Sequence, residues 1–158
     1  MKVGIVMGSA SDRPVMAGAS EILNEFGIEH EVKILSAHRT PAALQQWVES
    51  LRQRDFAAVI AAAGGAAHLA GVVAAFTTLP VIGVPVKSRS LEGIDSLLSM
   101  VQMPSGIPVA CVAIDGSKNA ALLAIEIMAV TDVTLRNKLS DFRAKQAAAV
   151  LAANELQN

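Results

Sequence analysis

Short apolar runs alternate with segments of helical periodicity along the whole chain, and this alternation constrains the fold most strongly. The expected strands are residues 3–7, 29–35, 56–62, 81–84 and 109–114. Their hydrophobicity is continuous, as is typical of parallel strands covered on both faces, and we expect Val32–Leu35 to be buried. The expected helices are residues 14–26, 42–54, 67–77, 93–101, 119–130 and 132–155. The pattern predicts an α/β fold of three layers (αβα) with a doubly wound parallel sheet, for which a flavodoxin-like topology is simplest.

Local signals mark the ends of the first two helices. Gly27 is a good residue to end the first helix in a left-handed conformation. Thr40 is a good N-cap for the second, and Pro41 suits its first position. The second helix has an apolar face formed by Leu44, Trp47, Val48 and Leu51.

The composition favours one domain that hides apolar surface in a homo-oligomer. The 158 residues suffice for one core, so we expect a single catalytic domain over residues 1–158. Only 17% of residues are charged, whereas an average globular domain has about 25%. The formal net charge of -1 gives no electrostatic footprint for nucleic acid or an anionic membrane.

The single cysteine, the N-terminal sequence and the interrupted apolar stretches together predict a cytoplasmic protein. The one cysteine, Cys111, lies in an apolar run and is expected to be a buried structural thiol rather than a reactive nucleophile. The chain enters a strand directly after Met1, without a signal-peptide pattern. Its apolar stretches are too interrupted to predict a membrane span.

Three strand-to-helix turns contain most of the small polar and ionisable residues in the first half. Ligands of open α/β sheets bind at the carboxyl ends of strands, where these turns lie. The first turn, Gly8-Ser9-Ala10-Ser11-Asp12, offers amides and hydroxyls suited to a phosphate. Asp12 could cap the following helix, accept hydrogen bonds from ribose hydroxyls, or do both.

The second and third turns add two histidines and an arginine. His38 could carry protons near neutral pH, and Arg39 offers a planar fork for phosphate or carboxylate. The third turn contributes Gly64, Gly65 and His68, although His68 could instead lie in the core. No zinc-ligand spacing and no nucleophile elbow is present in the sequence.

Four segments resemble one enzyme family closely and in order along nearly the whole chain. They are Met7-Gly8-Ser9-x-Ser11-Asp12, Ser36-Ala37-His38-Arg39-Thr40-Pro41, Ala63-Gly64-Gly65-Ala66-Ala67-His68-Leu69 and Asp95-Ser96-Leu97-Leu98-Ser99-x-Val101-Gln102-Met103-Pro104. The family is the class I catalytic subunit of phosphoribosylaminoimidazole carboxylase, also called N5-carboxyaminoimidazole ribonucleotide mutase. The third segment departs from the family pattern, because Ala70 and Val72 replace the usual proline and methionine. Ala62 also replaces a residue that is often glycine.

The resemblance implies a step of purine biosynthesis, a flavodoxin-like fold and an octamer. It implies that a carboxylate moves from N5 to C4 of aminoimidazole ribonucleotide, with His38 as the acid and base. The residues implied for the phosphate and ribose are Ser9, Ser11, Asp12, Ser36 and Arg39. Those implied for the wall near the imidazole and the carboxylate are Gly64, Gly65, His68 and Leu69.

The chemistry of this reaction fits those residue types. A carbamate loses carbon dioxide as its nitrogen gains a proton, and the ring carbon loses a proton after it attacks carbon dioxide. A histidine can perform both transfers near neutral pH, so no metal, nucleotide or redox cofactor is needed. Small residues such as Ala63, Ala66 and Ala67 would form a tight wall that retains carbon dioxide.

Two alternatives stay open. Enzymes of a related class carboxylate aminoimidazole ribonucleotide directly with carbon dioxide, but they typically have a lysine in place of Arg39. They also have a polar stretch in place of Gly65-Ala66-Ala67. A flavodoxin-like binding module is the other alternative, although only 3% of residues are aromatic, which disfavours a flavin sandwich.

The last expected helix, about residues 132–155, suggests an interface. Its apolar positions include Val133, Leu139 and Val150, and the run Ala147-Ala148-Ala149 suits close helix approach. Such a helix follows a complete sheet and has no obvious partner in its own subunit. We therefore expect it to pack on a neighbouring copy.

Overall fold

The computed structural model describes residues 1–155 and contains one five-stranded parallel sheet. The strands are β1 (Lys2–Met7), β2 (His30–Ile34), β3 (Phe56–Gly64), β4 (Val81–Val86) and β5 (Ala110–Cys111). Their order in the sheet is β2-β1-β3-β4-β5. This is the flavodoxin-like order, in which the chain reverses its direction across the sheet between β1 and β3. The predicted fold class is confirmed.

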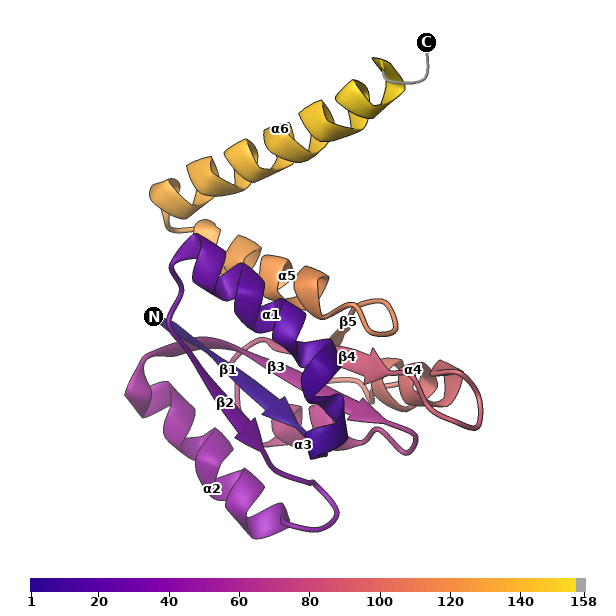
Figure 1. Ribbon diagram of the computed structural model, residues 1–158. Coiled ribbons are helices and arrows are strands. Elements are labelled where there is room, and N and C mark those ends of the chain that lie inside the picture. Colours follow the sequence, from indigo (N-terminus) through magenta and orange to yellow (C-terminus); the bar gives the residue numbers. More distant parts are fainter. Residues whose placement is uncertain (156–158) are drawn as a thin grey trace. The chain divides into compact units, whose positions relative to one another are not determined.

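Helices cover both faces of the sheet within the first 124 residues (Figure 1). Over all the described residues, the helices are α1 (Arg13–Phe26), α2 (Pro41–Leu51), α3 (Leu69–Ala75), α4 (Ile94–Val101), α5 (Ser117–Ala129) and α6 (Val133–Glu155), with 3₁₀ turns η1 (Ala10–Asp12) and η2 (Arg52–Arg54). Side chains of α2, α3 and α4 share one apolar cluster with Val6 of β1 and with several residues of β3. The start of α5 lies beside α1, where the Ser117 hydroxyl donates a hydrogen bond to the Val15 carbonyl at 2.5 Å.

The chain divides into two units, residues 1–124 and the part from residue 125 onward, with the boundary inside α5. The second unit contains the end of α5 and the whole of α6. Arg143 and Glu126 form an ion pair at 2.5 Å within it, and Val133, Val150 and Leu151 are exposed. Across residues 1–155, no helix combines the length and hydropathy needed to cross a bilayer.

The central strands are buried on both faces, which explains their continuous apolar sequence. Val3, Ile5 and Val6 are fully buried, as are most residues of β3. The four predicted core residues of α2 are buried, with Leu44 and Leu51 fully enclosed. Each such leucine stabilises the fold by about 1.5–3 kcal/mol relative to an exposed one.

The expectation that Val32–Leu35 is buried is wrong. Val32 and Ile34 expose 44% and 38% of their surface. Their strand, β2, is an edge strand that pairs only with β1.

The predicted limits of the last two strands are also wrong. β4 continues through Pro85 to Val86, and β5 is limited to Ala110–Cys111 instead of extending over 109–114. Pro85 still accepts a hydrogen bond from the Asp115 amide, but it has no N–H group to give back to β5. The ladder between β4 and β5 therefore ends early, while the pairing of β4 with β3 continues.

The helix limits differ from expectation by a few residues. α2 begins at Pro41 and ends at Leu51, and the expected remainder forms η2. α3 is shorter than predicted, because the turn before it occupies residues 65–68. Gly27 ends α1 with a φ of 74°, as predicted.

Candidate active site

A cleft of about 320 Å³ lies at the carboxyl ends of β1, β2, β3 and β4. Turns that are far apart in the sequence meet there because all four strands point the same way (Figure 1). The predicted site residues that line it are Ser9, Ser11, Asp12, Ser36, His38, Arg39, Gly64, Gly65 and Leu69. The remaining one, His68, contacts the cleft through His38.

The turn after β1 is a self-contained polar structure. The Ser9 amide donates to Asp12 Oδ2 at 3.1 Å, and the Ser11 hydroxyl donates to Ser9 Oγ at 2.9 Å. Asp12 therefore completes a capping box for η1, and it makes no cap hydrogen bond to α1. Burial raises the pKa of the Asp12 carboxyl, against the hydrogen bonds from Ser11 and Ser9 and the charge of Arg39.

Arg39 joins the turns after β1 and β2. Its Nη2 donates to the Gly8 carbonyl at 2.9 Å, and its Nε donates to Ser36 Oγ at 3.3 Å. Thr40 does not act as the predicted side-chain N-cap. Its hydroxyl instead accepts from the Ser36 amide at 2.9 Å and donates to the Ser36 carbonyl at 3.1 Å. The hydrogen bonds of Arg39 to Gly8 and Ser36 hold its guanidinium group beside the turn after β1.

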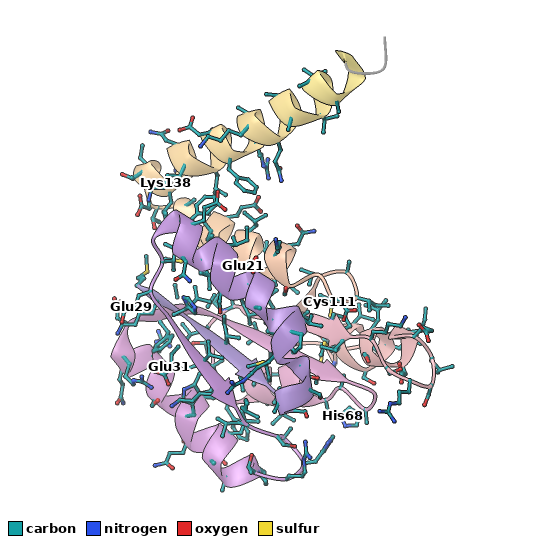
Figure 2. All side chains as sticks on the ribbon, in the orientation of Figure 1. Glu21, Glu29, Glu31, His68, Cys111 and Lys138 are labelled. Atoms are coloured by element: carbon teal, nitrogen blue, oxygen red, sulfur yellow. The ribbon has the colours of Figure 1, made fainter. Side chains whose placement is uncertain are left out.

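The two histidines meet across the cleft edge. His38 Nε2 lies 3.0 Å from His68 Nδ1, and the ring centroids are 5.1 Å apart with the planes at 87°. His68 lies beyond the end of β3, at the carboxyl edge of the sheet (Figure 2). Both residues are exposed, so the alternative that His68 lies in the core is wrong.

The end of β3 and the turn after it form an apolar wall of the cleft. Ala63 and Ala66 line it as predicted, but Ala67 is fully buried in the core cluster. Gly65 has a φ of 68°, a conformation that favours glycine. Its amide donates to Ser96 Oγ of α4 at 2.9 Å.

The segment of α4 that resembles the family forms hydrogen bonds with the turns that line the cleft. Ser96 is fully buried, and its hydroxyl donates to the Val86 carbonyl at 2.7 Å while it accepts from Gly65. Asp95 accepts from the Ser88 hydroxyl at 2.7 Å. These serine and aspartate side chains connect the turns after β3 and β4.

Sequence analysis missed the turn after β4. Lys87, Ser88 and Arg89 line the cleft, and none of them was among the predicted site residues. The available signal was two cations after an apolar run.

Cys111 lies outside this cleft. Its side chain is partly buried rather than enclosed, and burial raises the pKa of its thiol. Among residues 1–155, no group of three or more histidine, cysteine, aspartate or glutamate residues is placed to hold a metal ion.

Comparison with known proteins identifies relatives over most of the chain. N5-carboxyaminoimidazole ribonucleotide mutase of Pyrococcus abyssi is 56% identical over 142 residues, which are 90% of this chain and 82% of that protein. The protein of the same name from Vibrio vulnificus is 53% identical over 154 residues, 96% of each chain.

A solved structure is also similar to this chain over nearly its whole length. The crystal structure of Treponema denticola PurE has a TM-score of 0.89 and 31% sequence identity, and the match covers 97% of this chain and 96% of that one. The sequence profile of AIR carboxylase matches residues 2–149. The chain belongs to the AIR carboxylase family.

Proposed function

We propose that the protein is a mutase of de novo purine biosynthesis that converts N5-carboxyaminoimidazole ribonucleotide to 4-carboxy-5-aminoimidazole ribonucleotide. One observation carries the proposal. His38, Arg39 and serine hydroxyls line one cleft, and His68 contacts His38 at its edge, in a chain more than half identical to proteins named for this activity. The reaction is an isomerisation, so the two half-steps below balance without any other reactant.

The phosphoribosyl half of the substrate would bind where the turns after β1 and β2 meet. Ser9, Ser11 and Ser36 supply hydroxyls, and Arg39 supplies a guanidinium held over the Gly8 carbonyl. Asp12 offers acceptor oxygens to the ribose hydroxyls. Binding energy gathered there would hold the distant imidazole in place for reaction.

His38 would carry the proton between the half-steps. In the first, the bond between N5 and the carboxylate carbon breaks, N5 takes a proton from His38, and carbon dioxide forms. In the second, C4 attacks carbon dioxide and then returns its proton to His38, which restores the aromatic ring. The hydrogen bond to His68 supports this role, because it orients the ring that must give one proton to N5 and take another from C4.

The wall from the turn after β3 would hold the carbon dioxide. Gly64, Gly65 and Leu69 line it together with Ala63 and Ala66, and these residues bring no side-chain polar group that could attract water. Both half-steps could therefore take place in the cleft before carbon dioxide escapes. They need no metal or redox cofactor.

We also infer that the protein acts in the cytoplasm as a homo-oligomer, an octamer by resemblance. The low charge content supports assembly, as do the exposed Val32 and Ile34 on β2. The exposed Val150 and Leu151 on α6 fit the proposal that this helix packs on a neighbouring copy.

The test compares two substrates. Purified protein should form 4-carboxy-5-aminoimidazole ribonucleotide from the N5-carboxy isomer, and not from aminoimidazole ribonucleotide with bicarbonate. Turnover of the second mixture alone would indicate a direct carboxylase. Binding without turnover of either would indicate a binding module.

A further inference from the structure

We propose that Arg89 binds the migrating carboxylate of the ribonucleotide and so distinguishes carboxylated ligands from aminoimidazole ribonucleotide itself. This inference rests on the proposed function, because it assigns a residue to one group of that substrate. It concerns the turn after β4, which no motif of the sequence pointed to.

Three cationic side chains line the cleft, and two of them are already engaged. Arg39 donates to Gly8 and Ser36. Lys87 forms an ion pair with Glu92. Arg89 lines the cleft with no hydrogen-bond or ion-pair partner among residues 1–155. Its five N–H donors are available to a planar anion, for which a guanidinium fork is well shaped.

The order of the strands separates Arg89 from Arg39. Arg39 follows β2 and Arg89 follows β4, with β1 and β3 between these strands. Neighbouring strands lie about 4.8 Å apart, so the two strand ends are about 14 Å apart. The substrate likewise has two anionic groups, a phosphate on the ribose and a carboxylate on the imidazole side. If Arg39 takes the phosphate, Arg89 is the free cation on the side of the imidazole wall.

The segment around Arg89 is held in place by its neighbours. The Lys87 amide donates to Asp115 Oδ1 at 2.9 Å, and the Ser88 hydroxyl donates to Asp95 Oδ1 at 2.7 Å. On the other side, the Leu91 amide donates to Ser88 Oγ at 3.3 Å. The backbone that carries Arg89 is therefore ordered before any ligand arrives, which lowers the entropic cost of binding.

The chemistry predicts which kinetic parameter depends on Arg89. Substrate and product both carry a carboxylate, whereas the carbon dioxide between the half-steps is neutral. A cation that binds the carboxylate in substrate and product contributes mainly to affinity. Its loss should raise KM more than it lowers kcat.

The experiment compares two ligands that differ only in the carboxylate. Affinities for 4-carboxy-5-aminoimidazole ribonucleotide and for aminoimidazole ribonucleotide are measured by titration calorimetry. Arg89→Gln should weaken binding of the first by about tenfold to a hundredfold, the range for a hydrogen bond to a charged group, and leave the second unchanged. Arg39→Ala should weaken both, since it removes a contact to their shared phosphate.

Controls separate this inference from the proposed function. Arg52→Gln removes an exposed arginine that binds Thr78, before β3 and outside the cleft, and should change neither affinity. Equal losses for both ligands in Arg89→Gln, or no loss for the carboxylated one, would overturn the role of Arg89. So would a loss of carboxylate preference in Lys87→Gln alone. Wild-type protein that bound neither ligand would instead contradict the proposed function.

Discussion

At the scale of single residues, His38 is the group on which the proposed chemistry depends most. It lines the cleft, and its Nε2 is 3.0 Å from His68 Nδ1. A single hydrogen bond between two imidazoles needs one nitrogen to donate and the other to accept. The ring therefore has a defined orientation and a partner during a reaction in which it must both give and take a proton.

Replacing this histidine should abolish turnover without abolishing binding. His38→Asn retains a polar side chain of similar reach, but it cannot carry a proton near neutral pH. Turnover should fall by about 10²–10⁴-fold, the usual contribution of general acid–base catalysis, with little change in the affinity for aminoimidazole ribonucleotide. Steady-state kinetics and calorimetry on the same preparation measure both. Turnover near the wild-type rate would rule out His38 as the proton carrier.

Individual residues differ in how far the sequence could predict them. His38 and Arg39 were predictable because a histidine and an arginine follow an expected strand and precede a helix signal. Arg89 was not, because the order of the strands brings the turn after β4 to the same cleft. The placement of Ala67 in the core rather than the cleft wall also depends on how the turn after β3 folds. The presence of several small residues in the sequence does not determine which of them line the cleft.

At the scale of elements, α4 stabilises the turns that form the cleft. Ser96 lies on its buried face and bridges the Val86 carbonyl and the Gly65 amide. Replacing it with alanine would leave both groups without this partner. A buried polar group without a partner costs about 1–3 kcal/mol.

Ser96→Ala should therefore lower the free energy of unfolding by about 1–3 kcal/mol. It should also raise KM, because Gly65 forms part of the cleft wall. Denaturant unfolding gives the first quantity and initial rates the second. Ser140→Ala is a matched control, since Ser140 is exposed on α6 and donates only to the Arg136 carbonyl. Equal stability of the two variants would contradict the bridging role of Ser96.

The order of the elements was predictable, whereas several of their limits were not. Continuous apolar runs correctly indicated a parallel sheet, because β1, β3 and β4 are buried on both faces. The exposure of β2 and the shortness of β5 arise at the edges of the sheet. There a strand lacks a second partner, and an apolar run in the sequence does not reveal which strand lies at an edge.

At the scale of the whole molecule, the composition and the exposed apolar residues lead to a prediction about assembly. Full-length protein at micromolar concentration should form a homo-oligomer, an octamer by resemblance, in light scattering. Deleting residues 132–158 removes α6 and its exposed Val133, Val150 and Leu151. The deletion should give smaller species and loss of activity. A full-length monomer would refute the proposed assembly, whatever the deletion did.

In the proposed mechanism, a carboxylate moves from nitrogen to carbon of the same ribonucleotide within one cleft. The most direct measurement follows a ¹³C label in the N5-carboxylate of the substrate, with unlabelled bicarbonate in excess. We predict that 4-carboxy-5-aminoimidazole ribonucleotide forms with the label at its new carboxylate, because the cleft holds carbon dioxide between the half-steps. Product that carried only unlabelled carboxylate, or that formed only from aminoimidazole ribonucleotide and bicarbonate, would contradict this account.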